Sequence, residues 1–277
     1  MALIPEHYID SVVAIGVLNS AGTKNWIGTG FLYGDLREIT DDNRNTYILY
    51  LVTNKHVIEG LDEIFVKFNP QTDQSSQDFK LELKRPIDGT LQWVGHPDPE
   101  TDVAVFALNH QVLASAGMKF KFFQSDKNIL TSVDMHNNNI FEGNFIYVLG
   151  FPMGILSSDR QYVFARTGII SRIKDLYEKR SKDYVVDATV FPGNSGGPVI
   201  SKIENMSLSG TKAVNKSSLI GIIKAYIPYH DVAYSMQTKN PRITFEENSG
   251  LSIVEPVEKI IETIDEHKKI VSVKLSK

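Results

Sequence analysis

The stretch Phe191-Pro-Gly-Asn-Ser-Gly-Gly-Pro198 joins two runs of strand-forming residues, 184–190 and 198–200. Glycines surround Ser195, so the backbone can turn there without steric cost and aim its N–H groups at whatever the Ser195 hydroxyl attacks. The N–H groups of Gly193 and Ser195 could together stabilise a negative charge developing on oxygen. The alternative is a simple surface turn, which the β-rich runs on both sides disfavour. The stretch therefore predicts a nucleophilic serine held rigidly between two strands.

Length and composition limit the class of protein. The chain has 277 residues, of which 42% are hydrophobic and 22% charged, as in a globular fold that buries its own core. Its 29 basic and 33 acidic residues give a net charge of −4 and no electrostatic footprint for nucleic acid. The sequence has no cysteine, which excludes a disulfide framework, a zinc ribbon and thiol chemistry. We expect no cofactor and no metal.

The sequence gives no sign of a membrane segment. No run approaches the ~18 apolar residues of a membrane helix. The N-terminus carries Pro5, Glu6 and Asp10 instead of a basic segment and an apolar core, so a secretory signal is not expected. A chain without cysteine also suits a reducing compartment. These observations predict a cytoplasmic protein.

Short runs rich in Val, Ile, Phe and Tyr, bounded by turn residues, fill most of the chain before the C-terminal segment. Their regular spacing predicts antiparallel β-sandwiches or barrels and argues against β-α-β units. The predicted strands are residues 11–18, 28–33, 46–52, 64–68, 91–94, 103–108, 145–149, 161–170, 184–190, 197–200 and 218–226.

The C-terminal segment is predicted to be helical. Pro256 suits a first helical turn, and four apolar residues recur on one face, namely Val257, Ile260, Ile261 and Ile264. Residues 271–275 alternate like a short edge strand or tail.

The predicted strands fall into two groups of similar length on either side of a polar stretch. The predicted units are a first β-structure in residues 1–115, a linker in 116–144, a second β-structure in 145–255, and the helix and tail in 256–277.

A nucleophilic serine needs a base, and His56 is placed as one. It follows an apolar strand in Leu49-Tyr-Leu-Val-Thr-Asn-Lys-His-Val-Ile58, so the scaffold holds it near solvent. Asp102 opens the apolar run Asp102-Val-Ala-Val-Phe-Ala-Leu108, and its carboxylate could fix the tautomer of the imidazole. Taken singly, His56 could be a surface residue and Asp102 an ordinary turn residue. The two become informative only together with Ser195.

The order His, Asp, Ser and the sequence around each residue resemble trypsin-like (chymotrypsin-fold) serine proteases, in particular bacterial trypsin-like peptidases and the protease domain of the HtrA (Deg) group. The three contexts are Thr-Asn-Lys-His56-Val, Asp102-Val-Ala-Val and Gly-Asn-Ser195-Gly-Gly-Pro. Further matches are Gly28-Thr-Gly-Phe31, Val148-Leu-Gly-Phe-Pro-Met-Gly154, Gly221-Ile-Ile-Lys-Ala-Tyr226 and Gly250-Leu-Ser-Ile-Val-Glu-Pro256. The resemblance covers about residues 9–268. It implies an all-β fold of two perpendicular six-stranded antiparallel β-barrels, with the site in the cleft between them and the C-terminal α-helix after them.

The resemblance implies a role for each matching residue. Ser195 is the nucleophile, His56 the general base and then the general acid, and Asp102 the carboxylate that orients His56. The N–H groups of Gly193 and Ser195 form the oxyanion hole. Asn194 departs from the secreted enzymes, which carry an aspartate there to receive a new N-terminal ammonium after propeptide cleavage. Control by a loop or a partner is therefore expected in place of propeptide activation.

The resemblance also places a substrate pocket, with Thr189 at its base and Lys224, Ala225 and Tyr226 in its wall. No acid stands at the base, so a preference for Arg or Lys is not expected. Tyr226 stands where many relatives have glycine and would narrow the pocket. Lys224 either favours an acidic or polar substrate residue or faces solvent. We expect a small or apolar residue before the scissile bond.

Two other interpretations concern the same residues. Gly193-x-Ser195-x-Gly197 satisfies the G-x-S-x-G pattern of α/β-hydrolases, but a predicted strand follows Ser195 and no β-α-β alternation surrounds it. That interpretation is rejected. The alternative that stays open is a catalytically silent protease-fold module that binds proteins, against which the complete set of His56, Asp102 and Ser195 argues.

The sequence thus predicts a serine endopeptidase that acts through an acyl-enzyme. Its expected partners are a protein or peptide substrate and an activating protein, with no nucleic acid and no membrane. Two polar insertions, 201–217 and 227–249, are predicted as long surface loops, and such loops are usually functional or mobile. Loops 173–183 and 227–249 are expected to control activity.

Overall fold

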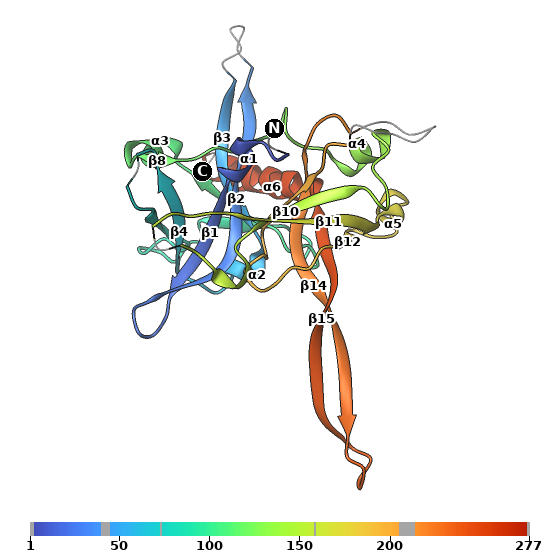
Figure 1. Cartoon of the computed structure of the whole chain (residues 1–277). Coiled ribbons are helices and arrows are strands. Elements are labelled where there is room, and N and C mark those ends of the chain that lie inside the picture. Colours follow the sequence, from blue (N-terminus) through green and yellow to red (C-terminus); the bar gives the residue numbers. More distant parts are fainter. Residues whose placement is uncertain (1–2, 40–44, 73, 158, 205–213, 276–277) are drawn as a thin grey trace.

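The computed structural model describes residues 3–39, 45–72, 74–157, 159–204 and 214–275. These residues form one mainly antiparallel β-structure in each half of the chain and a long C-terminal helix that contacts strands of both halves (Figure 1). The predicted all-β fold class with a C-terminal helix is confirmed.

The first half is a nine-stranded sheet with the main order β5-β4-β1-β2-β3-β7-β6. Its strands are β1 (Val12–Leu18), β2 (Lys24–Glu38), β3 (Thr46–Thr53), β4 (Glu63–Pro70), β5 (Gln77–Glu82), β6 (Trp93–Gly95), β7 (Ala104–Leu108), β8 (Met118–Lys119) and β9 (Phe123–Gln124). A closed six-stranded barrel was expected here, whereas the structure has a half-barrel. Within the described residues, no ladder joins β5 to β6, and the segments next to them meet through an isolated bridge between Lys84 and Leu91.

The second half is a closed six-stranded barrel, as predicted, in the order β10-β11-β12-β15-β14-β13. Its strands are β10 (Phe145–Gly150), β11 (Phe164–Arg172), β12 (Tyr184–Asp187), β13 (Pro198–Ser201), β14 (Leu219–Tyr234) and β15 (Pro241–Pro256).

Short helices precede the first strand and occupy several connections between strands. They are α1 (Glu6–Ile9), α2 (Lys55–Ile58), α3 (His110–Ser115), α4 (Ser132–Asn137), the 3₁₀ turn η1 (Pro152–Gly154) and α5 (Lys174–Tyr177). The predicted linker 116–144 contains α4, and its strands β8 and β9 pair with β4 and β2 of the first half. Of the predicted loop 201–217, residues 205–213 lie outside the described ranges.

One buried cluster is shared by the two halves. It includes Phe31 and Val105 from the first half, Leu149 and Ile200 from the second, and Ile260 from the C-terminal helix. Two further clusters fill the interior of each half separately. Because the shared cluster packs both halves against the same side chains, it fixes their relative position and with it any site between them.

Helix α6 (Val257–Leu275) leaves β15 and packs on β6 and β7 of the first half. Of its predicted apolar face, Val257, Ile260 and Ile264 are buried and Ile261 is half-buried. Glu262 accepts a hydrogen bond of 2.8 Å from His96 Nε2. Residues 271–275 continue the helix, so the expected edge strand or tail was wrong. A short alternating run fits either structure, and extending an existing helix needs no new nucleation. No helix in the described ranges is long and apolar enough to cross a membrane.

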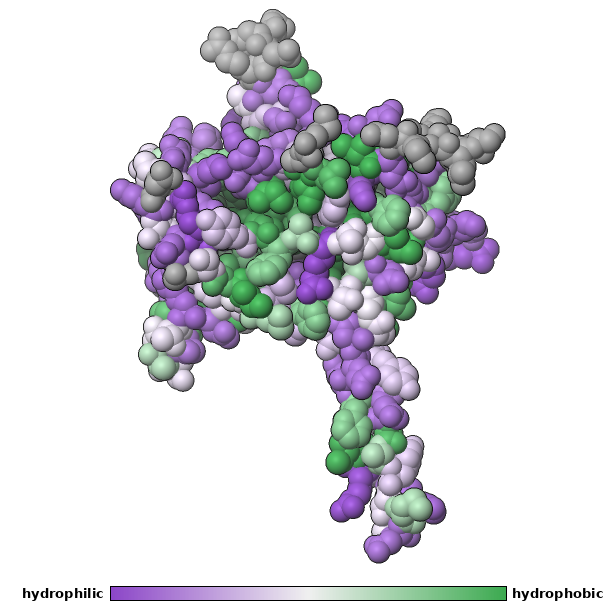
Figure 2. All heavy atoms as spheres, viewed as in Figure 1, coloured by the Kyte–Doolittle hydropathy of each residue, from purple (hydrophilic) through white to green (hydrophobic). Residues whose placement is uncertain are grey.

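Strands β14 and β15 extend far beyond the barrel as a two-stranded arm, residues 227–249 (Figure 1). Its strands pair from Pro228 with Asn248 to Tyr234 with Pro241. The prediction of a long loop over 227–249 was therefore wrong, because the charged residues hide the strand alternation. Figure 2 shows apolar side chains along the arm. Phe245, in the part of β15 that belongs to the arm, is half-exposed.

Candidate active site

Strands β3 and β7 bring His56 and Asp102 together. The strands pair antiparallel with Thr53 opposite Ala104, so the end of one lies beside the start of the other. The turn of α2 then directs His56 to the carboxylate of Asp102. His56 Nδ1 lies 2.5 Å from Asp102 Oδ2, and the His56 backbone N–H donates to Oδ1 at 3.1 Å. With Nδ1 engaged in this way, Nε2 is left to act as a base.

The Asp102 carboxylate is held in its charged form. Burial opposes ionisation, but the hydrogen bonds and charge of His56, together with the Lys55 backbone N–H, outweigh it and lower the pKa of Asp102. The Asp102 side chain is 16% exposed and that of His56 50%, so the carboxylate lies behind the imidazole and the imidazole faces solvent. This arrangement orients a base and stabilises its protonated form.

The backbone around Asp102 is also fixed on both sides. Asn54 Nδ2 donates to the Asp102 carbonyl oxygen at 2.6 Å, and the Asp102 N–H donates to Glu255 Oε1 at 3.0 Å. Sequence reasoning missed both partners. Asn54 lies inside the quoted Thr-Asn-Lys-His56 context. Glu255 is the one charged residue in the quoted run Gly250-Leu-Ser-Ile-Val-Glu-Pro256, which is the signal that could have drawn attention to it.

Ser195 lies on the turn between β12 and β13, and two glycines beside it adopt left-handed backbone conformations. Gly193 has φ +96° and Gly196 has φ +83°. A side chain at either position would overlap backbone, at the carbonyl oxygens of Phe151 and Thr29 respectively. No hydrogen bond within the described residues uses the N–H of Gly193 or Ser195. These two N–H groups thus have no hydrogen-bond partner among the described residues, which leaves them available to an oxyanion.

Asn194 holds this turn from within. Its Oδ1 accepts a hydrogen bond from the Phe191 N–H at 3.1 Å, and its backbone N–H donates to the Phe191 carbonyl oxygen at 2.9 Å. The asparagine is 1% exposed, and its Nδ2 has no partner among the described residues. The amide therefore supports the turn locally, at the position where the secreted enzymes use an aspartate.

Thr29 connects the Ser195 turn to the first half by hydrogen bonds. It lies on β2, in the Gly28-Thr-Gly-Phe31 motif. Its Oγ1 donates to the Gly193 carbonyl oxygen at 2.6 Å and accepts the Phe151 N–H at 3.0 Å. Its backbone N–H donates to the Ser195 carbonyl oxygen at 2.9 Å. Thr29 is fully buried. The motif is visible in the sequence, but no local pattern predicts this role for Thr29.

The same contacts place the Ser195 turn next to the end of β3. Thr53 Oγ1 donates to the Thr29 carbonyl oxygen at 2.8 Å, and Thr53 lies just before α2, which carries His56. Within the described residues the Ser195 hydroxyl makes no hydrogen bond to His56. Such contacts are often long in enzymes without substrate and shorten when it binds.

The four residues expected in a substrate pocket lie around β15. Ala225 and Tyr226 are on β14 and pair with β15, while Thr189 follows β12 on the other side of β15. The Tyr226 hydroxyl donates to Glu246 at 2.5 Å. Lys224 Nζ lies 2.9 Å from Glu255 Oε1 and donates to the carbonyl oxygen of residue 100 at 2.7 Å, so its charge is engaged by the protein itself.

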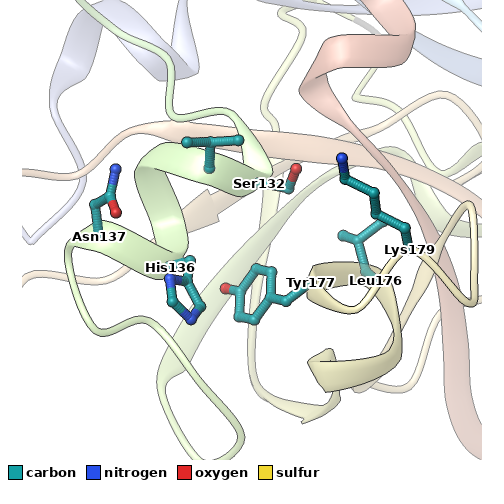
Figure 3. A pocket seen from close by; sticks show the side chains of 7 residues that line it. Ser132, His136, Asn137, Leu176, Tyr177 and Lys179 are labelled. Atoms are coloured by element: carbon teal, nitrogen blue, oxygen red, sulfur yellow. The ribbon is translucent and has the colours of Figure 1, made fainter.

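A separate cavity lies between α4 and α5. It has a volume of about 190 Å³, and Figure 3 shows His136 and Tyr177 at its edge. Its lining does not include His56, Asp102 or Ser195.

The chain is similar to known proteins in sequence and in structure. The model of the trypsin-like peptidase domain matches residues 28–206, more than half of the chain. Two relatives are both described as probable periplasmic serine endoprotease DegP-like. That of Pseudomonas savastanoi pv. phaseolicola is 27% identical over 170 residues, 60% of this chain and 28% of the relative. That of Halomonas elongata is 29% identical over 178 residues, 62% of this chain and 26% of the relative.

The chain thus spans about a quarter of the length of these relatives. Among solved structures, the scabies mite inactivated protease paralogue S-I1 aligns with a TM-score of 0.47 and 11% identity over 94% of this chain and 96% of that one. Since the family model covers the segments that carry His56, Asp102 and Ser195, the chain belongs to the trypsin-like peptidase domain family.

Proposed function

We propose that this protein is a serine endopeptidase that hydrolyses peptide bonds with Ser195, His56 and Asp102. The observation that carries the proposal is the 2.5 Å contact between His56 Nδ1 and Asp102 Oδ2, close to a rigid serine turn with two free N–H groups. Membership of the trypsin-like peptidase family supports it.

In the proposed reaction, Ser195 Oγ attacks the carbonyl carbon of the scissile peptide bond while His56 Nε2 takes its proton. The N–H groups of Gly193 and Ser195 stabilise the negative charge that develops on the carbonyl oxygen. His56 then gives the proton to the leaving amine, which leaves an acyl-enzyme on Ser195. A water molecule, deprotonated by His56, attacks the ester, and the return of the proton to Oγ releases the acid and free Ser195.

Substrate preference is the second part of the proposal. Because Lys224 is paired with Glu255, the pocket wall presents no free positive charge from that residue to an acidic substrate. A small or apolar residue before the scissile bond suits a wall narrowed by Tyr226. Profiling cleavage sites in a denatured proteome by mass spectrometry tests this; a clear excess of Arg, Lys, Asp or Glu at that position would reject it.

Control by a partner is the third part. Lys182, in the segment after α5, lies 2.6 Å from Asp98 and 2.7 Å from Glu100, immediately before Asp102. The arm begins directly after Tyr226. A protein that bound the segment with Lys182 would therefore act next to Asp102, and a protein that bound the arm would act next to the pocket wall. Full activity of the isolated chain, unchanged by added cell extract, would count strongly against this part.

A cytoplasmic location stays a prediction, which fractionation of cells expressing the untagged chain would check.

The direct test of the activity is hydrolysis of an unfolded, fluorescently labelled protein by the purified chain. We expect cleavage by the unmodified protein and by Ser20→Ala, which removes an exposed hydroxyl in a turn. Ser195→Ala should show none while keeping the circular dichroism spectrum of the unmodified protein. Equal cleavage by Ser195→Ala would reject the proposal.

A further inference from the structure

Glu255 is a carboxylate buried between the two halves of the molecule. It is 1% exposed and lies at the end of β15, in the half that carries Ser195. Its Oε1 accepts the Asp102 N–H at 3.0 Å and lies 2.9 Å from Lys224 Nζ. A buried carboxylate is costly unless it is paired and hydrogen-bonded, and both partners are present here.

Several residues form hydrogen bonds with Asp102, and they do not all belong to the same half of the molecule. His56 and Asn54, which contact the carboxylate and the carbonyl oxygen, belong to the same half as Asp102. Glu255 comes from the other half. A hydrogen bond to the Asp102 backbone from that side fixes the aspartate, and with it the imidazole of His56, relative to the half that carries Ser195.

Lys224 keeps this contact in place. Its ammonium is 2.9 Å from Glu255, donates to the carbonyl oxygen of residue 100 at 2.7 Å and lies 3.8 Å from Asp183 Oδ2. It therefore neutralises Glu255 and joins β14 to the segments that precede Asp102 and β12. A cavity of about 590 Å³, lined in part by Thr101 and Asp183, opens onto the pair.

We propose that Glu255, paired with Lys224, is a positioning residue that sets the Asp102–His56 pair against Ser195 across the interface of the two halves. The proposal rests on the proposed serine-protease function. Catalytic groups must be held within about 0.5 Å of their productive positions, so loss of this contact should slow turnover without removing any catalytic group.

Four variants separate positioning from stability. Glu255→Gln keeps a side-chain oxygen that can accept the Asp102 N–H but removes the charge. Glu255→Leu removes both. Lys224→Met/Glu255→Leu removes the buried ion pair as a whole, and such replacements are often neutral or stabilising. Glu266→Leu/Lys269→Met removes an ion pair of 3.2 Å on α6 and serves as the matched control, since neither residue contacts Asp102.

The measurements are kcat and KM for a peptide ester, the midpoint of urea unfolding, and the ¹³C–¹H signals of the His56 ring at one fixed pH. We expect the double variant Lys224→Met/Glu255→Leu to be folded. Its kcat should fall at least about tenfold, because the Asp102 N–H no longer donates to the charged carboxylate of Glu255. Any change in KM should be smaller than the change in kcat, and the His56 ring signals should move. Glu255→Gln should retain more kcat than either leucine variant, and the α6 control should match the unmodified protein.

A purely structural role predicts a different result. In that case kcat would follow stability, and the double variant would have the kcat and His56 signals of the unmodified protein, which would overturn the proposal. If the unmodified protein fails to turn over any ester, the proposed function is in doubt, but the His56 signals still decide the inference. Ring signals that are the same in the unmodified protein and in the double variant would reject it without any activity measurement.

Discussion

At Asp102, contacts from three directions converge on one residue. Its carboxylate faces His56, its carbonyl oxygen accepts from Asn54 and its N–H donates to Glu255. An asparagine at this position would keep the shape and much of the packing, but it would lose the charge and favour the wrong tautomer of His56. The residue thus combines a structural role with an electrostatic one that substitution can separate.

We predict that Asp102→Asn folds normally and that its turnover falls by roughly 10⁴-fold, the size of loss known for the corresponding change in the Ser-His-Asp template. The measurement is kcat on a peptide ester, with circular dichroism to check the fold. Asp231→Asn, an exposed aspartate on the arm, is the control and should leave kcat unchanged. A folded Asp102→Asn protein with normal turnover would remove Asp102 from the proposed site.

Asp78 makes stability depend on pH. It lies between Lys24 and Lys67, with Oδ1 3.0 Å from Lys67 Nζ and Oδ2 2.5 Å from Lys24 Nζ. Burial works against the charged form, but the hydrogen bonds from both lysines outweigh it and lower the pKa of Asp78. Folding lowers the pKa of Asp78, so its charged form stabilises the folded protein. This stabilisation is fully present above the pKa of Asp78 in the unfolded chain, about 4, and is lost as the pH falls through the lower pKa of Asp78 in the folded protein.

We therefore predict that the free energy of unfolding falls less between pH 6 and pH 3 in Asp78→Asn than in the unmodified protein. Urea unfolding at the two pH values measures the difference. Glu59→Gln, at an exposed glutamate without an ion pair among the described residues, should behave like the unmodified protein. An identical loss of stability in Asp78→Asn would show that this carboxylate is not linked to folding.

Among the elements, the arm stands apart from the rest of β14 and β15. The barrel segments of these strands are mostly buried, whereas Tyr229, Ile243 and Phe245 are each at least half exposed. A two-stranded ribbon without a third strand or a covering helix is at best marginally stable in water. The arm should therefore open locally at little cost to the rest of the fold.

Replacement of residues 229–247 by an Asn-Gly turn should leave the barrel and the site intact. We expect the urea midpoint and the fluorophosphonate labelling of Ser195 to be unchanged, and amide hydrogens in the intact arm to exchange much faster than those of β10 and β13. Loss of labelling in a folded truncated protein would mean that the arm supports the site directly, beyond any role in binding a partner.

The strands and helices also show which sequence patterns predict secondary structure correctly. Runs with strong alternation or continuous apolar character, such as 46–52 and 145–149, became β3 and β10 with nearly the predicted bounds. Strand β5 and the arm escaped prediction because charged and polar residues interrupt their alternation, and register with a neighbour decides such strands. Residues 271–275 were misassigned because five residues cannot distinguish a period of two from a helical one.

In the whole molecule, α6 ties the end of the chain back to its first half. Ile260 belongs to the cluster shared by both halves and is fully buried. We predict that Ile260→Ala lowers the free energy of unfolding by about 2–5 kcal/mol. Chemical unfolding measures this, and Val271→Ala on the exposed side of the helix should change it by less than about 0.5 kcal/mol. Equal effects of the two changes would mean that α6 is not part of the shared core.

Of the proposed site, only the residues that would carry out the chemistry could be predicted from the sequence. His56, Asp102 and Ser195 stand in short contexts that carry their own signal, and the structure places His56 against Asp102. The residues that position them could not be predicted, because their function depends on contacts between distant segments. Thr29 acts on Ser195 across 166 positions of sequence and Glu255 on Asp102 across 153, which no local pattern encodes.

The proposed nucleophile is tested most directly by fluorophosphonate labelling of the purified protein, followed by intact mass and peptide mapping. We predict one covalent adduct, located on Ser195 and absent from Ser195→Ala, while Ser20→Ala labels like the unmodified protein. Such an adduct requires both an activated hydroxyl and a formed oxyanion hole. An adduct that persists in Ser195→Ala, or no adduct on Ser195 either in isolation or in cell extract, would rule out the serine-protease function proposed here.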